Sequence, residues 1–266
     1  MNTFLNKLKS SLLDKGFTAQ IKAEEVGKSV KYLLILMLII GSVIMIKAEI
    51  VLYNAANETV TTLQTKFPYF ELKDGHLKCS GPMPFILNNT PVKDEKDAIL
   101  IIDTTGKYTP EILDHYKSGV IFFESKVVYK KDAFETKTYN FSDIKVNFTK
   151  TELINIINNW TIPALIFTFL ISLFFIFLAK LLGVFLLSII GIVMNKILKA
   201  ELDYQTIFKI CIYAIVLPSI IKFGLGIVDV DIPYFWIVYY GIASFYIYKF
   251  IKEFNELQEE EVSSDN

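Results

Sequence analysis

Hydrophobic residues are concentrated in four segments, and the chain between the first and the second has the mixed composition of a globular domain. The four segments are Tyr32–Ile46, Ile162–Met194, Ile207–Val228 and Ile232–Ile251. An apolar segment of roughly 20 residues is long enough to cross the hydrocarbon core of a bilayer as a helix. The pattern therefore predicts an α-helical membrane protein in which a small polar domain is inserted after the first membrane helix.

The first apolar segment predicts an uncleaved anchor helix over residues 31–53. Lys31 and Lys47 border its most apolar part, and their long side chains can reach the membrane interface. A cleaved signal peptide is the alternative, but the preceding polar region is too long for one and no small-residue cleavage site follows Ile46. The lysine-rich N-terminus, residues 1–30, is expected to be cytoplasmic. Its first apolar residues fit either a helix on the membrane surface or a short solvated helix.

The polar segment, residues 54–159, is predicted to be an extracytoplasmic α+β domain. Residues Phe70–Cys79 alternate around Asp74-Gly75, which is the strongest short signal for a β-hairpin. Four further segments have the composition of strands: Ala98–Ile102, Gly119–Phe123, Lys126–Lys130 and Lys137–Asn140.

Two helix starts are predicted in the same domain. Thr109 followed by Pro110 reads as an N-cap with proline in the first helical position. Thr149 and Glu152 have the spacing of a capping box, which begins a helix that leads toward the membrane.

The C-terminal helix block, residues 160–252, is predicted to cross the membrane at about 161–179, 207–228 and 232–250. As one helix, 161–194 would be about 50 Å long, too long for a single perpendicular crossing. It is either one long helix or two crossings, and we prefer one, because almost no residues are available for a turn. With the anchor this makes four crossings, which place the lysine pairs of the block in the cytoplasm. The acidic tail, residues 253–266, is then cytoplasmic and solvated.

Composition and charge remove several classes of function. The chain is 53% hydrophobic with a net charge of −1, so there is no basic surface for nucleic acid. Its two cysteines, Cys79 and Cys211, fall in the polar domain and in an apolar helix, which argues against a disulfide. No histidine, cysteine or carboxylate cluster has the spacing of metal ligands, and no cofactor or catalytic motif is present.

One loop of the polar domain is a candidate ligand contact. Asp103, Thr104, Thr105 and Gly106 follow an apolar strand, a position where functional aspartates are often found. The alternative is a turn in which the aspartate only caps the end of the strand. An aspartate-dependent enzyme would also need a second carboxylate close to Asp103.

In the helix block, ionisable residues and a proline are the candidate functional positions. Lys180 and Lys209 lie in or beside apolar segments, where a charge is expensive and often functional. Snorkelling of each amine to the interface is the simpler explanation. Pro218 is expected to kink its helix. The four apolar segments contain no acidic residue, which argues against an ion-coupled transporter.

Several stretches together resemble a family of uncharacterised bacterial membrane proteins that is common in Firmicutes. They are the lysine-rich start with its anchor, Phe67–Gly75, Ile99–Gly106, and Tyr204–Tyr213 with Pro218. Some members of that family are described as maltodextrin-utilisation proteins, which implies an association with carbohydrate uptake. The last stretch is also similar to the membrane core of the Yip-type superfamily and adds Tyr213 to the candidate positions.

These observations favour a multi-pass protein of the cell membrane that is a non-enzymatic accessory or sensor. Its extracytoplasmic domain would bind a ligand or a partner, and its helices would contact the lipid bilayer and a membrane transport complex. The alternative is a small channel or transporter formed by the helix block.

Overall fold

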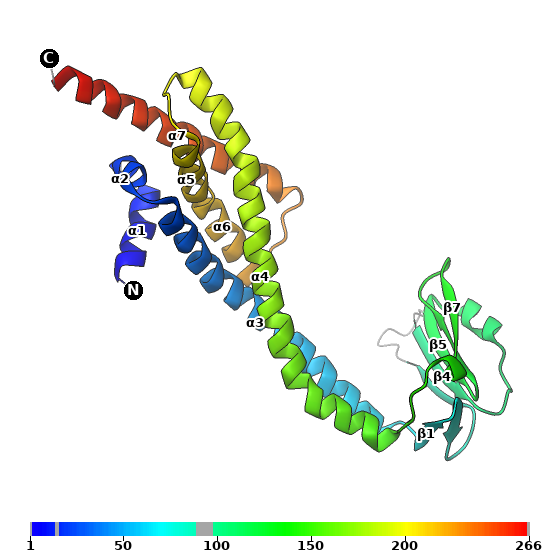
Figure 1. Ribbon diagram of the computed structural model, residues 1–266. Helices are drawn as coiled ribbons and strands as arrows, with labels where there is room; N and C mark the ends of the chain where they lie inside the picture. The colour runs from blue at the N-terminus through cyan, green and yellow to red at the C-terminus, as the bar shows by residue number, and fades with distance from the viewer. Residues whose placement is uncertain (1, 14–15, 89–97, 265–266) are drawn as a thin grey trace. The chain divides into compact units, whose positions relative to one another are not determined.

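The computed structural model describes residues 2–13, 16–88 and 98–264. The chain divides into two compact units: the first comprises residues 1–52 and 165–266, and the second comprises residues 53–164. Two long helices, α3 (Val26–Thr65) and α4 (Lys150–Leu198), each contribute to both units. Most of the described chain is helical, and its strands lie in the second unit (Figure 1).

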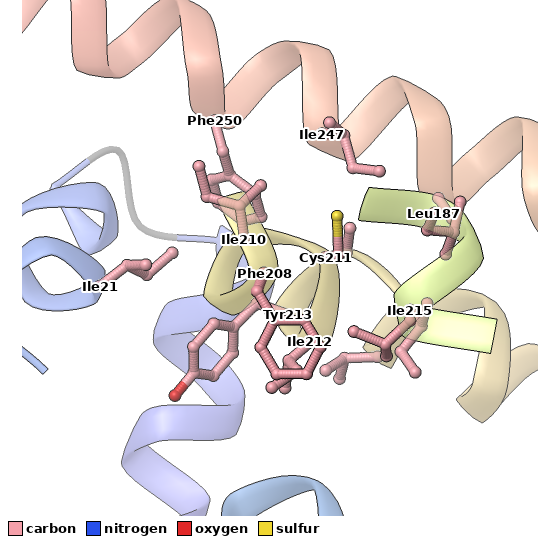
Figure 2. Packing of buried hydrophobic residues seen from close by; sticks show 14 of the residues in the cluster. Ile21, Leu187, Phe208, Ile210, Cys211, Ile212, Tyr213, Ile215, Ile247 and Phe250 are labelled. Atoms are coloured by element: carbon pink, nitrogen blue, oxygen red, sulfur yellow. The ribbon is translucent and has the colours of Figure 1, made fainter. Parts of the chain in front are cut away.

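The first unit is a block of helices around α5 (Tyr204–Ala214). Its other members are α1 (Asn2–Leu13), α2 (Phe17–Ala23), α6 (Val216–Ile227), α7 (Phe235–Ser264) and parts of α3 and α4. Every side chain from Thr206 to Ala214 is buried, so α5 is the central helix of the block. Figure 2 shows Ile21 of α2, Leu187 of α4 and Phe250 of α7 gathered around it.

Among the residues that the structure describes, three helical segments are long and apolar enough to cross a membrane: α3, α4, and α5 with α6 taken together. Helix α3 has 40 residues and α4 has 49, which makes them about 60 Å and 70 Å long. Each therefore exceeds the roughly 30 Å of a bilayer core. The segment 161–194 lies within the single helix α4, as preferred from the sequence. A fourth crossing, at 232–250 in α7, stays a prediction.

The helix that contains Pro218 is interrupted three residues before the proline, in agreement with the predicted kink. Helix α5 ends at Ala214 and α6 begins at Val216, with Ile215 between them. Proline has no N–H to donate to the carbonyl of Ala214, and its ring clashes with that carbonyl. The interruption at Ile215 avoids both problems.

The acidic tail is also corrected, since α7 continues to Ser264 instead of ending near residue 250. Phe254 is buried one turn after Phe250, so the apolar face of the helix extends into the predicted tail. Lys249–Glu253 and Lys252–Glu256 pair at i,i+4 along the same segment. Residues 265 and 266 lie outside the described residues.

The N-terminal helices differ from the solvated alternative, while a position at the membrane surface stays a prediction. Phe17 and Ile21 of α2 are completely buried in the core of the first unit, and Phe4 and Leu8 of α1 pack against it. The apolar residues near the start of the chain therefore contribute to the core of the helix block.

The second unit contains two sheets. One has the order β2-β1-β8 and comprises β1 (Phe70–Lys73), β2 (His76–Cys79) and β8 (Phe148–Thr149). The other has the order β3-β4-β5-β6-β7 and comprises β3 (Phe85–Asn88), β4 (Ala98–Asp103), β5 (Ser118–Phe123), β6 (Lys126–Lys130) and β7 (Thr136–Asn140). The hairpin at Asp74-Gly75 and the strands predicted from composition are confirmed.

Alternating residues of the larger sheet contribute to two different apolar clusters. Ile99 and Ile101 of β4 pack toward the 3₁₀ helix η1 (Pro110–His115), where Leu113 is buried. Leu100 and Ile102 point to the opposite face, toward β1, β2 and the ends of α3 and α4 in this unit. A second 3₁₀ helix, η2 (Phe141–Asp143), closes that side.

Candidate functional site

The second unit contains a partly open cavity of about 600 Å³ on the face of the larger sheet that carries Leu100 and Ile102. Helices α3 and α4 and both sheets form its walls. The residues from the sheets, η2 and α4 are apolar: Phe70, Leu72, Leu77, Leu87, Leu100, Ile102, Phe122, Phe141, Phe148, Leu153 and Ile157. A cavity of this size is within the range of sites for small molecules, about 300–1,000 Å³.

Helix α3 contributes the polar part of the lining. Glu58 and Thr62 share one face of the helix, with Thr59 beside them, and Lys66 follows directly after its last residue, where its amide still donates to the carbonyl of Thr62 at 2.9 Å. The hydroxyl of Thr59 donates to the carbonyl of Ala55 at 2.8 Å and is therefore turned back onto the helix. The cavity thus combines an apolar interior with a narrow polar stripe on one wall.

The two helix ends beside the cavity are fixed by specific hydrogen bonds. Lys150 donates its amine to the carbonyl of Phe67, at 2.8 Å, just beyond the end of α3. At the start of α4, the amide of Thr149 donates to the carboxylate of Glu152 at 2.8 Å, and the amide of Glu152 donates to the hydroxyl of Thr149 at 3.2 Å. The capping box predicted from the sequence is confirmed, and it anchors one wall of the cavity.

The loop from Asp103 to Gly106 does not line this cavity. The side chain of Asp103 is buried and accepts hydrogen bonds from the amide and hydroxyl of Thr105, at 2.9 and 2.6 Å, and from the amide of Tyr108, at 2.6 Å. Thr104 is half-buried, and Gly106 adopts the left-handed conformation with a φ of 73°. The geometry is that of a turn closed by its aspartate, and ligand contact there stays a prediction.

Hydrogen bonding determines the charge of Asp103. Burial on its own raises the pKa of this carboxyl, but the hydroxyl of Thr105 and the amides of Tyr108, Thr105 and Gly106 outweigh it, so the pKa is lower than usual. The carboxylate therefore stays ionised and is directed at its own turn.

The amines of Lys180 and Lys209 both donate hydrogen bonds to groups of the protein, and their snorkelling to a membrane interface stays a prediction. The amine of Lys180 donates to the hydroxyl of Tyr239 at 2.9 Å, and that hydroxyl is 2.8 Å from the hydroxyl of Ser219. A small cavity of about 180 Å³ lies beside this group, lined also by Gly183 and Tyr240. Ser219 follows Pro218, so the proline positions one member of the cluster.

The side chains of Lys209 and Tyr213 form hydrogen bonds with the segment between α2 and α3. The amine of Lys209, 5% exposed, donates to the carbonyls of Lys22 and Glu24 at 3.2 and 2.8 Å. The hydroxyl of Tyr213 donates to the carboxylate of Glu24 at 2.6 Å. Figure 2 shows the Tyr213 ring extending from α5 with its hydroxyl directed away from the apolar core.

Glu24 is the centre of this arrangement and was missed in the sequence, where it reads as part of a polar N-terminus. It also forms an ion pair with Lys7 of α1 and accepts from the hydroxyl of Ser29 at 3.2 Å. Burial on its own raises the pKa of Glu24, but the hydrogen bonds from Lys7, Tyr213 and Ser29 outweigh it and keep the pKa below its ordinary value. The carboxylate therefore connects α1, α3 and α5.

A second carboxylate corrects the expectation that the membrane helices lack acidic residues. Glu49 lies within α3, in the extension of the anchor, and accepts a hydrogen bond from the hydroxyl of Thr168 of α4 at 3.0 Å.

The remaining titratable candidates of the second unit are apart from one another. His76 lies 3.5 Å from Glu124, and Cys79 is half-buried, which raises its pKa to about 11. Within residues 2–13, 16–88 and 98–264, no group of three histidine, cysteine or carboxylate side chains could hold a metal ion.

The fold and the cavity define a mostly helical protein with three long apolar helices and a small sheet-containing unit that contains an apolar pocket. The chain belongs to the family described as "Protein of unknown function (DUF1189)", whose model matches residues 5–251. No curated protein and no solved structure matches it. The description of the family names no activity, so the function of this chain is inferred from its geometry.

Proposed function

We propose that this protein is a non-enzymatic membrane accessory or sensor whose second unit binds a ligand in the 600 Å³ cavity. That cavity is the observation that carries the proposal. Apolar cavities of this size in proteins are uncommon, because their lining loses dispersion contacts and water inside finds few hydrogen-bond partners. A bound ligand supplies the missing contacts.

The proposal includes a topology in the cell membrane. The N-terminus, residues 1–30, is cytoplasmic, residues 54–159 form the extracytoplasmic domain, and residues 160–252 complete four crossings. The distribution of lysines supports this orientation, because basic residues are retained in the cytoplasm. The helix block then transmits or receives a signal, or contacts a membrane transport complex.

The proposal includes an association with maltodextrin uptake and a relation to the Yip-type superfamily. Both rest only on resemblances in sequence. The lining of the cavity gives direct sugar binding little support. A maltodextrin presents many hydroxyl groups, and each would need a hydrogen-bond partner to be buried without cost. The sheets and α4 offer leucine, isoleucine and phenylalanine there. Any link to carbohydrate is therefore proposed to run through a partner.

The test is hydrogen exchange of the full chain in lipid nanodiscs with a panel of maltodextrins and single-chain amphiphiles. A ligand in the cavity should slow exchange in β1, β2, β4 and β5. Leu87→Trp fills the cavity and should abolish the effect, whereas Ile86→Trp, on the exposed face of the same strand, should retain it. If no class of compound changes exchange, the proposal is wrong. If the effect persists in Leu87→Trp, the ligand binds elsewhere.

The alternative, a small channel or transporter, is favoured by the polar cluster of Lys180, Tyr239 and Ser219 beside its cavity of about 180 Å³. A partly buried cation beside a cavity would attract a small anion. Anion flux into proteoliposomes tests this function: Lys180→Met should reduce the flux, and Lys222→Met, at an exposed position, should not. Flux equal to that of protein-free liposomes would reject the alternative.

A further inference from the structure

We infer that the ligand of the second unit is a single-chain amphiphile whose acyl chain occupies the cavity and whose anionic head group lies at Lys66. This inference rests on the proposed function, because it names the class of ligand for the same site. The head group can be a carboxylate, as in a free fatty acid, or a phosphate, as in a lysophospholipid.

The volume and the lining together point to a chain of methylene groups. The cavity is about four times as large as the roughly 150 Å³ apolar cavity that accepts benzene. Its walls contain aliphatic and phenyl groups from several elements, with Leu77, Leu100 and Phe122 as examples from three different strands. Such walls give dispersion contacts from several sides and no fixed hydrogen-bond geometry, which suits a flexible hydrocarbon.

The polar stripe on α3 suggests where the head group lies. Lys66 is exposed at the C-terminal end of the stripe, and Thr62 lies one turn before it. Among the described residues, the amine of Lys66 forms no ion pair. Glu58, two turns before Lys66, would repel an anion from the other end of the stripe. A carboxylate or phosphate at Lys66 would gain a charge-assisted hydrogen bond while its chain enters the apolar interior.

The location of the site along the chain agrees with such a ligand. The helices that border the cavity, α3 and α4, are the same two helices whose apolar parts are long enough to cross a membrane. Amphiphiles are concentrated in membranes, so the protein would have a supply of this ligand wherever those helices are inserted.

Photoaffinity labelling of the full chain in lipid nanodiscs tests the inference. The probe is a palmitic acid analogue that carries a diazirine and an alkyne, and labelled peptides are located by mass spectrometry. Label is expected in the strands that line the cavity. Unlabelled fatty acids should compete, with an affinity that rises about fourfold for each added methylene until the cavity is full.

Two positions on α3 provide a matched pair of variants. Thr59 lines the cavity and Thr61 does not, yet both side chains are exposed and both donate to the carbonyl four residues earlier. Thr59→Trp should reduce labelling at least tenfold, and Thr61→Trp should leave it unchanged. Equal labelling in the two variants would overturn the inference, as would label confined to residues 165–198 of α4, which reports bulk lipid.

The head group is tested with Lys66→Met and, as a control, Lys78→Met on β2, where the lysine is exposed and outside the cavity. Lys66→Met should weaken competition by palmitate and by lysophosphatidic acid about tenfold, and should leave competition by hexadecanol unchanged. If one of the two anions competes better in the unaltered protein, the stronger competitor identifies the ligand as a free fatty acid or as a lysophospholipid. Equal competition by hexadecanol and palmitate in the unaltered protein would overturn the assignment to Lys66.

Failure of this inference can be distinguished from failure of the proposed function. If maltodextrins slow hydrogen exchange in the strands while acyl probes neither label them nor slow exchange, ligand binding stands and the acyl assignment is wrong. If neither class has an effect, both are wrong. Leu87→Trp and Ile86→Trp repeat the comparison on a strand, so the result does not depend on correct folding of one variant.

Discussion

At the scale of single residues, Glu24 and Lys180 of the first unit are paired with groups that lie far away in the sequence. The carboxylate of Glu24 forms an ion pair with Lys7 and accepts hydrogen bonds from the hydroxyls of Ser29 and Tyr213. The amine of Lys180 donates a hydrogen bond to the hydroxyl of Tyr239. Pairing is expected, because a buried polar group without a partner costs about as much as a lost hydrogen bond. The partners could not be read from the sequence, since spacing along the chain gives no information on contacts between helices.

The hydrogen bonds of Glu24 should stabilise the N-terminal helices. Glu24→Gln removes the charge that Lys7 faces and should lower the free energy of unfolding by about 1–3 kcal/mol, with faster hydrogen exchange in α1 and α2. The neighbouring Glu25 is 78% exposed, so Glu25→Gln should have almost no effect. Equal exchange in the two variants would contradict the role of Glu24.

Asp103 should make the second unit sensitive to acid. Asp103→Asn should cost about 1–3 kcal/mol at neutral pH, because the carboxylate accepts three hydrogen bonds in its turn. The pKa of Asp103 is lower in the folded protein than the roughly 3.9 of an unfolded chain. Its stabilisation is therefore complete above pH 4 and is lost as the pH falls through the folded value.

The measurement for Asp103 is denaturant unfolding of the full chain between pH 3 and pH 7. The difference between the original protein and Asp103→Asn should shrink below pH 4. Glu124→Gln, at an exposed position beside His76, serves as the control and should show a small difference throughout. If the difference in free energy of unfolding between the two proteins does not change with pH, the charge of Asp103 does not contribute to stability and only the shape of its side chain does.

At the scale of elements, local patterns predicted the strands well and the helix ends poorly. The Asp74-Gly75 hairpin and the Thr149–Glu152 capping box are short signals whose partners lie within a few residues, so no distant contact is needed to form them. The end of α7 depends instead on Phe254 and on Asn255, whose side chain donates to the carbonyl of Leu198 at 2.7 Å. Such contacts between distant residues extend the helix beyond the end that the local composition predicts.

The close approach of α4 to α5 depends on Gly191. A Cβ atom there would lie 2.6 Å from the γ2 methyl of Ile207 and 3.4 Å from the sulfur of Cys211. Gly191→Val should therefore separate the two helices and lower the free energy of unfolding by about 1–3 kcal/mol. Gly224→Val is the control, because a Cβ atom at Gly224 meets no atom within 4 Å. Equal thermal stability of the two variants in nanodiscs would contradict this packing.

At the scale of the whole molecule, the number of crossings decides on which side of the membrane each segment lies. Three segments of the described chain are long and apolar enough to cross, and α7 is the proposed fourth. One side of α7, including Ala243, Ile247 and Phe250, is buried in the helix block. A helix that packs in this way can be less apolar overall than one surrounded by lipid, so its length and composition alone do not show whether it crosses.

Labelling of single cysteines in intact cells measures the topology. With Cys79 and Cys211 replaced by serine, an impermeant maleimide should label Lys137→Cys and Asp231→Cys directly. It should label Lys9→Cys and Lys252→Cys only after the membrane is permeabilised. Labelling of Lys252→Cys in intact cells, with Lys9→Cys still protected, would mean three crossings and an extracytoplasmic C-terminus.

The sequence by itself determined the apolar segments, the inserted α+β unit and most of its strands, because hydrophobic periodicity and turn chemistry act over a few residues. Only the tertiary structure decided what the candidate residues do. Lys209 and Tyr213 hold the segment at Glu24, and Asp103 closes its own turn. The cavity was likewise invisible in the sequence, because Leu87 and Phe122 look like ordinary core residues until the folded elements leave a space between them.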